Sequence, residues 1–369
     1  MQPPHEHGAR VLHVVTDTDR RGAQVFANDL SRLMCHNGAL SRTVALTAGG
    51  QGAQLDLTVM GGRARSGRTL RRLRREMRES DVTVAHGSKT LIACTLAGMG
   101  LGVPLVYRNI SDPAYWLSTK ARRLRVRLML GRAAHIVALW PGGAEYLAAE
   151  LGLSRNRITV IPNGVPVADF RPPTLSERQS ARTRFGLPAS APVLVYAAAL
   201  QPEKHPETAV QALAWLPEDT HLLMIGGGPL REQVAALAES TAPGRVVIAG
   251  QIDDPVRAFW AADLIVLPSE GEGLPAVLIE SALCGLPGVV SSSGGNADIV
   301  RHDVTGFVVD PADPVALATY ARRAFARRAD MGRAADQHCR TLYDMDSVTT
   351  QWQSVIERVV ASRNKQAVQ

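Results

Sequence analysis

The stretch LPSEGEGLPAVLIESALCGLPGVVSSSGGNADIVRHDVTGFVVD, residues 267–310, is the most informative part of this 369-residue chain. Within it, Glu272 and Glu280 are eight positions apart and are separated by Gly-Leu-Pro and an apolar run. A strand pattern ends at Pro268, and Pro275 is typical of the first position of a helix, where no backbone donor is needed. We therefore expect one carboxylate in the turn before a helix and the other about one turn inside it. The free N–H groups and partial positive charge of that helix end suit a pyrophosphate.

Apolar runs alternate with helical patterns on both sides of this stretch. Strands are predicted at residues 10–16, 82–85, 105–108, 136–139, 159–161, 193–197, 221–225, 246–249, 264–267, 288–291 and 307–309. Helices are predicted at residues 23–34, 175–185, 206–216, 230–239 and 346–360. This alternation predicts parallel sheets with helices on both faces, and the chain length favours two such domains.

The 267–310 block resembles the E-x7-E signature of retaining nucleotide-sugar glycosyltransferases of family four, which have the GT-B fold. The similarity extends from Glu272 through Cys-Gly-Leu-Pro at 284–287 to Gly-Gly-Asn at 294–296. It implies an α/β protein with two Rossmann-like domains whose parallel sheets face each other across a cleft. The implied acceptor-binding domain covers 1–170 and the donor-binding domain covers 171–345. A C-terminal helix over 346–369 would cross back to the first domain.

The same resemblance implies roles for the residues around the signature. Glu272 would accept hydrogen bonds from hydroxyls of the donor sugar, and Glu280 would accept them from the ribose diol. Lys204, at the end of Ala-Leu-Gln-Pro-Glu-Lys, resembles the lysine of the family's G-R-L-x-x-E-K and would stabilise the diphosphate leaving group. Further donor contacts are expected from Gly22, Gly228, Gln251, Gly273, Leu274, Pro275, Gly294 and Gly295. For Gly22 the alternative is a tight strand-to-helix turn that needs glycine.

The clearest departure from the family pattern is Ala199, which stands where relatives carry an arginine. A bidentate arginine–phosphate contact contributes about 1.5–3 kcal/mol, so its loss would slow transfer roughly ten- to hundred-fold. Two alternatives to an active transferase follow. The chain could be a catalytically weakened nucleotide-sugar-binding protein, or a GT-B epimerase that acts on the nucleotide sugar itself.

The first half of the chain offers candidates for sugar and acceptor contacts. His86 follows a predicted strand, where the family carries a histidine close to the donor sugar, and we predict a catalytic role through hydrogen bonding and not as a general base. Arg108, Asn109 and Asp112 follow the next strand and are candidates for acceptor binding. The alternative for a lone histidine is a purely structural role.

Composition sets further limits. The four cysteines lie far apart without a CxxC pair, which fits a reducing cytosol. No run of eighteen apolar residues and no signal-peptide pattern is present. We find no DxD-type site placed to suggest a bound metal, and the resemblance implies transfer without a metal or other cofactor. These features predict a cytoplasmic protein.

The net charge of +7 is unevenly placed. Up to Val165 there are 23 Lys and Arg against 11 Asp and Glu, with dense arginine runs at 63–78 and 120–132. Solvated helix faces are one interpretation, and docking of basic helices on the inner face of an anionic membrane is another. Nucleic-acid binding is disfavoured because aromatic residues, at 5%, do not interleave the arginines.

The sequence therefore predicts an enzyme that moves a hexosyl group from a nucleotide diphosphate sugar to a hydroxyl, with retention of configuration. UDP-sugars are the commonest donors in the family, and GDP-mannose is the second. Acceptors in the family include lipid-linked saccharides, polysaccharide units, cyclitols and secondary metabolites. The two glutamates are not assigned as the acid and nucleophile of a hydrolase, because the departing phosphate is thought to take the acceptor proton.

Overall fold

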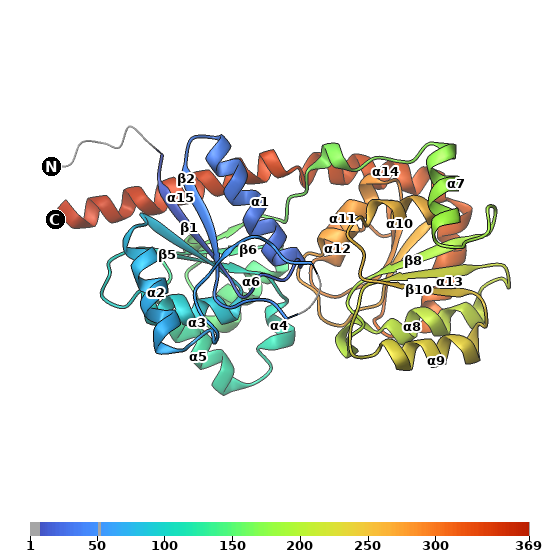
Figure 1. Ribbon diagram of the computed structural model, residues 1–369, viewed down its shortest axis with the longest axis horizontal. Helices are drawn as coiled ribbons and strands as arrows, with labels where there is room; N and C mark the ends of the chain where they lie inside the picture. Colours follow the sequence, from blue (N-terminus) through green and yellow to red (C-terminus); the bar gives the residue numbers. More distant parts are fainter. Residues whose placement is uncertain (1–7, 51–52, 369) are drawn as a thin grey trace. The chain divides into compact units, whose positions relative to one another are not determined.

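A computed structural model describes residues 8–50 and 53–368. Contacts along the chain divide it into two compact units (Figure 1). Unit 1 runs up to Gly164 and resumes at Met345, and unit 2 is Val165–Asp344. The sequence predicted the domain boundary at residue 170, and the structure divides a few residues earlier, after Gly164.

Unit 1 is built on a seven-stranded parallel sheet of order β3-β2-β1-β4-β5-β6-β7. Its strands are β1 (Arg10–Val15), β2 (Leu40–Ala45), β3 (Thr58–Val59), β4 (Val82–His86), β5 (Leu105–Asn109), β6 (His135–Ala138) and β7 (Ile158–Val160). β4 and β5 are buried along their whole length, as expected of central parallel strands covered on both faces.

Helices cover both faces of this sheet. They are α1 (Gly22–His36), α2 (Gly67–Arg78), α3 (Ser88–Ala97), α4 (Pro113–Trp116), α5 (Lys120–Leu130), α6 (Pro141–Leu151) and α15 (Met345–Val368), with a 3-10 turn at Arg155–Arg157. Apolar side chains of α1 and α15 pack on one face, and those of α2, α3, α5 and α6 pack on the other. The last helix of the chain therefore belongs to the core of unit 1, where Trp352 is fully buried.

Unit 2 repeats this design with a six-stranded parallel sheet of order β10-β9-β8-β11-β12-β13. Its strands are β8 (Val193–Ala197), β9 (His221–Ile225), β10 (Val246–Gly250), β11 (Leu264–Leu267), β12 (Gly288–Ser291) and β13 (Gly306–Val309). Because all six strands run the same way, the loops that follow them gather at one edge of the sheet. The residues predicted to bind the donor lie on these loops or on the helices that they lead into.

The helices of unit 2 also lie on both faces (Figure 1). They are α7 (Leu175–Arg184), α8 (Pro206–Gln211), α9 (Arg231–Thr241), α10 (Val256–Ala261), α11 (Ala276–Leu283), α12 (Asn296–Ile299), α13 (Pro314–Ala326) and α14 (Arg328–Leu342). Short 3-10 helices occupy Val167–Asp169, Pro202–Lys204 and Ala212–Trp215. Helices α8, α9 and α13 share one core cluster with the sheet, whereas α7 packs against α10 and α11 against α14.

The sequence located the central strands well and the edges less well. Strands β8, β9, β11 and β12 have the predicted bounds. The edge strands β2 and β3 were not predicted, because β2 is only partly buried along most of its length and lacks a continuous apolar run. Pro275 is the N-cap of α11 and not its first helical residue, so that prediction was wrong by one position.

Candidate functional site

Lys204 and Glu272 meet at the carboxyl edge of the unit 2 sheet. Lys204 ends the 3-10 helix that follows β8, and Glu272 lies in the loop that follows β11. The Lys204 Nζ is 2.8 Å from Glu272 Oε1, and it also donates a hydrogen bond of 2.9 Å to the Gly271 carbonyl. Glu272 is buried, with 8% of its surface exposed. The structure thus brings together the two residues predicted to act on the leaving group and on the sugar.

A serine that the sequence analysis did not single out holds the Glu272 loop in place. The Ser293 hydroxyl accepts a hydrogen bond of 3.0 Å from the Glu272 N–H and donates one of 2.7 Å to the Glu270 carbonyl. Two residues earlier, the Ser291 hydroxyl donates to the Ser269 carbonyl. The three consecutive serines at 291–293 were the only sequence signal for this contact.

Gly294 and Gly295 complete the junction between the two loops. Gly294 adopts a φ of +53°, and a Cβ there would lie 2.3 Å from the Glu272 carbonyl oxygen, so only glycine fits. The Gly295 N–H donates a hydrogen bond of 2.7 Å to the Gly273 carbonyl. Donor contacts were predicted at these two glycines, and the Gly295 amide fixes the loop that carries Glu272.

The glycine-rich turn after β9 packs directly on the segment that contains Ala199. A Cβ at Gly228 would lie 2.3 Å from the Leu200 carbonyl oxygen, and the Leu200 N–H donates a hydrogen bond of 3.0 Å to the Gly227 carbonyl. The close approach explains the glycine without invoking a ligand. It also places the half-buried Ala199 beside the turn.

Two further basic residues lie at this edge. Arg231 begins α9 and is exposed, and one of its guanidinium nitrogens lies 3.4 Å from where a Cβ would stand at Gly250, which ends β10. Gln251, the residue predicted to hold the nucleotide base, follows Gly250 and is exposed. His205 follows Lys204 in the left-handed region at φ +46°, with Glu207 3.3 Å from its Nδ1 and Glu270 3.5 Å from its Nε2.

Glu280 is the fifth residue of α11, about one turn inside the helix as predicted. Leu274 before the helix is buried, and Pro275 and Glu280 are half-buried. Burial raises the pKa of the Glu280 carboxyl from its ordinary 4.5 to about 7. Hydroxyl donors would favour its ionised form, so binding of a ribose diol there would release a proton near neutral pH.

Unit 1 carries its own cavity, of about 320 Å³, at the carboxyl ends of β1, β4 and β5. It is lined by Val15, Thr16, Asp17, Arg21, Ala23, Gln24, His86, Gly87, Ser88, Lys89, Ile110 and Ser111. Arg21 is paired with Asp17 at 2.6 Å and with Asp19 at 3.0 Å. Gly22 is the exposed first residue of α1, directly beside this cavity wall.

His86 belongs to a buried chain of polar side chains under α1 and α15. Its Nε2 is 3.0 Å from His13 Nδ1, and its Nδ1 is 3.2 Å from a guanidinium nitrogen of Arg108. Arg108 also binds the Asn163 side-chain oxygen, and its guanidinium carbon lies 3.8 Å from the centre of the Phe26 ring. Sequence reasoning missed His13 because nothing local distinguishes it from an ordinary strand residue.

The geometry determines the proton positions in this chain. A guanidinium only donates, so His86 Nδ1 accepts, and His86 Nε2–H then donates to His13 Nδ1. Burial, and then the Arg108 charge, lower the pKa of His86 well below its ordinary value and that of His13 to about 3. Burial also lowers the pKa of Arg108 to about 9. Both histidines are therefore neutral near pH 7, and both ring nitrogens of His86 are engaged by His13 and Arg108.

The candidates for acceptor binding are placed differently from our prediction. Arg108 and Asn109 are buried, and the Asn109 side chain donates a hydrogen bond of 2.9 Å to the Ser111 carbonyl. Asp112 is the N-cap of α4, where its carboxylate accepts a hydrogen bond of 2.9 Å from the Ala114 N–H. The alternation of side chains along β5 turns Arg108 onto the face covered by α1. Direct contact of Arg108 or Asn109 with an acceptor would require these side chains to leave their present partners.

Two structural features of residues 8–50 and 53–368 concern metal binding and membrane spanning. No cluster of three or more His, Cys, Asp or Glu side chains has the geometry to hold a metal ion in that part of the chain. No helix there is long and apolar enough to cross a membrane.

Comparison with protein families identifies both units. Residues 20–169 match the profile of Glycosyltransferase Family 4, and residues 177–338 match that of the Glycosyl transferases group 1. The chain belongs to the group 1 glycosyltransferases. The match to two adjoining profiles agrees with the resemblance carried by the Glu272–Glu280 block.

Curated relatives match this glycosyltransferase chain over part of their length. A D-inositol 3-phosphate glycosyltransferase of Xylanimonas cellulosilytica is 36% identical over 248 residues, which are 64% of this chain and 57% of that protein. A UDP-Gal:alpha-D-GlcNAc-diphosphoundecaprenol alpha-1,3-galactosyltransferase of Escherichia coli is 26% identical, with 62% of each chain covered. The chain thus spans about 57% of the length of the first of these relatives and 62% of the second.

Solved structures show the fold over nearly the whole chain. HepE of Anabaena, in complex with UDP and glucose, has a TM-score of 0.83 at 18% identity and covers 95% of this chain and 99% of its own. WaaG, a glycosyltransferase involved in lipopolysaccharide biosynthesis, has a TM-score of 0.73 at 18% identity and covers 94% and 99%. The predicted GT-B fold class is confirmed.

The raised pKa of Glu280 predicts a pH dependence of stability. The folded carboxyl keeps its proton up to about pH 7, whereas the unfolded one loses it near pH 4.5. The free energy of unfolding should therefore fall as pH rises from 4.5 to 7 and level off above. Glu280→Gln should remove the contribution of this carboxyl to the fall in the free energy of unfolding. The variant should therefore be as stable as the parent at pH 4.5 and more stable at pH 8. Thermal unfolding across this range measures the difference.

The control is Glu239→Gln, a change at an exposed position on α9. Its curve should run parallel to that of the parent. A Glu280→Gln curve parallel to the parent's at every pH would contradict the assigned proton.

Proposed function

We propose that this chain transfers a hexosyl group from a UDP-sugar to a hydroxyl acceptor with retention of configuration. The observation that carries the proposal is the contact of 2.8 Å between Lys204 and Glu272 at the carboxyl edge of the unit 2 sheet. Open parallel sheets bind their ligands at this edge. Two relatives support the donor: HepE was solved with UDP and glucose, and the Escherichia coli relative is a UDP-Gal galactosyltransferase.

The Lys204–Glu272 pair suggests how the donor is engaged. In the absence of ligand the ammonium and the carboxylate neutralise each other, and Lys204 is also bound to the Gly271 carbonyl. A bound donor would break this ion pair. The diphosphate oxygens would then bind the Lys204 ammonium, and the sugar hydroxyls would donate hydrogen bonds to the freed Glu272 carboxylate. The exchange places positive charge where negative charge develops as the bond to the leaving group breaks.

The chain's own residues account for the remaining steps of the proposal. Glu280 would accept hydrogen bonds from the ribose diol, and Gln251 would lie against the base. The departing phosphate would take the proton of the acceptor hydroxyl, so neither glutamate serves as an acid or nucleophile. We propose that no metal is required, since Lys204 and the N-terminus of α11 supply positive charge at this edge.

The second candidate function is nucleotide-sugar binding without efficient transfer. Ala199 provides no guanidinium. Burial raises the pKa of Tyr196, whose hydroxyl donates a hydrogen bond to the Lys204 carbonyl, and the nearby carboxylates of Glu272, Glu207 and Glu203 raise it further. Negative charge from these carboxylates weakens the binding of a diphosphate. Arg231, exposed at the start of α9, is the guanidinium best placed to compensate.

Substitution of the paired residues tests the proposal. With UDP-glucose and UDP-galactose as donors and EDTA present throughout, Lys204→Ala and Glu272→Gln should each lower turnover at least about ten-fold. They should differ in binding. Lys204→Ala should lower the affinity for UDP. Glu272→Gln frees the Lys204 ammonium and should leave the affinity for UDP unchanged or higher. Nucleotide release measures turnover, and calorimetry measures UDP binding.

Controls separate the two candidate functions. The exposed Glu239→Gln change should leave both readouts unchanged. UDP binding without nucleotide release, across an acceptor panel of cyclitol phosphates and lipid-linked saccharides, would favour the binding protein. Unchanged turnover in both Lys204→Ala and Glu272→Gln would refute the assigned site, and loss of turnover in EDTA that metal restores would refute the metal-free scheme.

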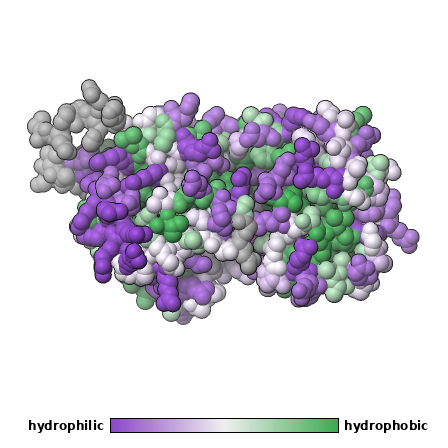
Figure 2. All heavy atoms as spheres, viewed as in Figure 1, coloured by the Kyte–Doolittle hydropathy of each residue, from purple (hydrophilic) through white to green (hydrophobic). Residues whose placement is uncertain are grey.

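We also propose that α5 docks unit 1 on an anionic membrane surface. Leu124 and Leu128 lie one turn apart on α5 and are 59% and 66% exposed. Lys120, Arg122, Arg125 and Arg127 of the same helix are exposed around them. Figure 2 shows hydrophilic side chains gathered over the nearby α2, whose sequence is GRTLRRLRREMR. Exposed leucines surrounded by basic residues are typical of helices that lie in a membrane interface.

Vesicle sedimentation tests this proposal. The protein should bind vesicles that contain phosphatidylglycerol, and not those of phosphatidylcholine alone, with binding that weakens as salt rises. The double change Leu124→Ser and Leu128→Ser should reduce binding to the anionic vesicles several-fold. Leu175→Ser, at a leucine 82% exposed in unit 2, is the matched control. Equal binding by the double variant and the parent would contradict docking through α5.

A further inference from the structure

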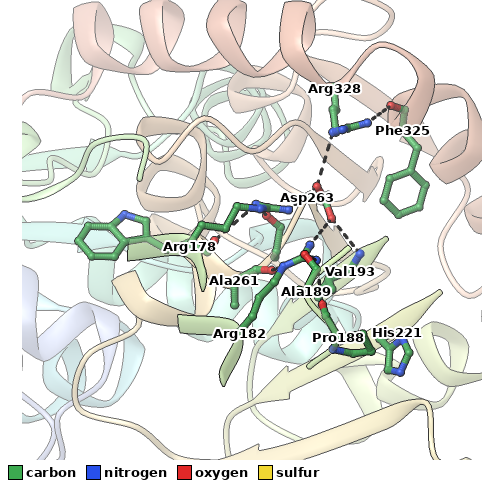
Figure 3. A network of polar contacts seen from close by, with 12 residues as sticks. Arg178, Arg182, Pro188, Ala189, Val193, His221, Ala261, Asp263, Phe325 and Arg328 are labelled. Atoms are coloured by element: carbon green, nitrogen blue, oxygen red, sulfur yellow. Dashed lines mark hydrogen bonds and ion pairs between the residues drawn. The ribbon is translucent and has the colours of Figure 1, made fainter. Parts of the chain in front are cut away.

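Three guanidinium groups surround one carboxylate at the amino edge of the unit 2 sheet (Figure 3). Asp263, directly before β11, is 9% exposed. Its carboxylate lies 2.6 Å from a guanidinium nitrogen of Arg178, 3.0 Å from one of Arg182 and 3.5 Å from one of Arg328. It also accepts a hydrogen bond of 3.0 Å from the Val193 N–H. The cluster therefore holds two more positive charges than negative ones.

Arg182 has a structural role. Its side chain is 3% exposed and donates hydrogen bonds to the carbonyls of Ala261, Pro188 and Ala189 as well as to Asp263. These contacts hold the C-terminal end of α10 and the segment before β8. These contacts fix Arg182 by packing, and its positive charge also faces the cavity described below.

Arg328 is different because its contacts are long and its charge is not matched. Its side chain is 60% exposed, and besides the 3.5 Å contact with Asp263 it donates a 3.4 Å hydrogen bond to the Phe325 carbonyl. The Asp263 oxygen that it approaches already accepts the much shorter contact from Arg178. Arg328 thus adds a largely unneutralised charge to a cluster whose carboxylate is already engaged.

A cavity of about 280 Å³ opens onto these three guanidinium groups. It is lined by Arg178, Arg182, Ala189, Ser190, Ala191, Pro192, Asp263, Phe325 and Arg328, with Asp263 as its one carboxylate. A second cavity of about 360 Å³ shares Arg178, Asp263 and Arg328. Its lining also includes one further arginine and one further carboxylate, Arg333 and Asp336, and is apolar near Pro172, Phe259 and Leu286. The two adjoining cavities combine a strongly basic end with an apolar one.

We propose that this cluster is a binding site for a soluble phosphomonoester, with the phosphate at Arg178, Arg182 and Arg328 and the organic group toward Pro172 and Leu286. A phosphomonoester dianion matches the surplus of two positive charges. Its three free oxygens accept the hydrogen bonds that guanidinium groups donate best. Bound phosphate would also join the start of α14 to α7 and so stabilise unit 2 against unfolding.

This site is separate from the donor site described above. Asp263 precedes β11 and contacts the first residue of β8, whereas Lys204 and Glu272 follow these strands. The strands are parallel, so the two sites lie at opposite edges of the sheet, separated by roughly 13–17 Å for strands of four to five residues at about 3.3 Å each. Failure of donor binding would therefore not affect this inference.

Phosphate binding in purified variants of the full chain tests the site. Inorganic phosphate and glycerol 3-phosphate should raise the unfolding temperature of the parent, whereas chloride at the same ionic strength should not. Arg328→Gln should lower the affinity for phosphate at least about ten-fold, because one charge-assisted contact is lost. Because Arg328 is exposed, its variant should unfold near the parent's temperature without phosphate. Arg322→Gln, at an exposed position on α13 outside both cavities, should bind phosphate as the parent does.

Phosphate could also bind at the diphosphate site, so the unfolding temperature of Lys204→Ala is measured with phosphate as well. The stabilisation should persist in Lys204→Ala and be lost in Arg328→Gln. The opposite pattern, or an equal shift with chloride, would overturn the proposal. Vesicles containing phosphatidic acid distinguish a lipid headgroup: Arg328-dependent binding to them, with none to glycerol 3-phosphate, would overturn the assignment to a soluble ester.

Discussion

The parallel direction of every strand within each sheet is the constraint on which the rest of the structure depends. A parallel strand must be reached by a crossover, so helices cover both faces and all loops that follow strands gather at one edge. In unit 2 this edge collects segments that are distant in sequence, among them Lys204 after β8, the Gly226–Pro229 turn after β9 and Glu272 after β11. The opposite edge collects the segments that precede the strands and holds Asp263 with its arginines. One topological rule thus creates two chemically different ends of the same sheet.

Backbone contacts between loops make the carboxyl edge specific. Ser293 accepts from the Glu272 N–H and donates to the Glu270 carbonyl, while Gly295 donates to the Gly273 carbonyl. The left-handed Gly294 permits the two loops to approach. Glu272 is consequently held at a buried position where its carboxylate reaches Lys204. The glycines and serines of the 291–296 segment act on the site through the shape of the loop.

Unit 1 uses a different device at its corresponding strand ends. His13, His86 and Arg108 lie on three adjacent strands of one sheet face and form a hydrogen-bonded chain beneath α1 and α15. Trp352 of α15 stacks on His86 with ring centres 6.3 Å apart. The guanidinium is buried without a carboxylate and relies on Asn163, the histidine and the Phe26 ring. Segments from the beginning, middle and end of the chain therefore hold the strand end that carries His86.

The sequence by itself determined the fold class and the central strands of both sheets. These follow from local signals: continuous apolar runs, and glycine and proline at turns. The roles expected at Lys204, Glu272 and Glu280 rest on the family resemblance of the motifs around them. Only the tertiary structure decided that the Lys204 ammonium is paired with Glu272, that Ser293 holds the glutamate loop and that Arg108 turns inward. It alone assembled Arg178, Arg182, Asp263 and Arg328 from three separate segments. Contacts of this kind depend on which strand neighbours which, and that order is not encoded in the spacing of residues along the chain.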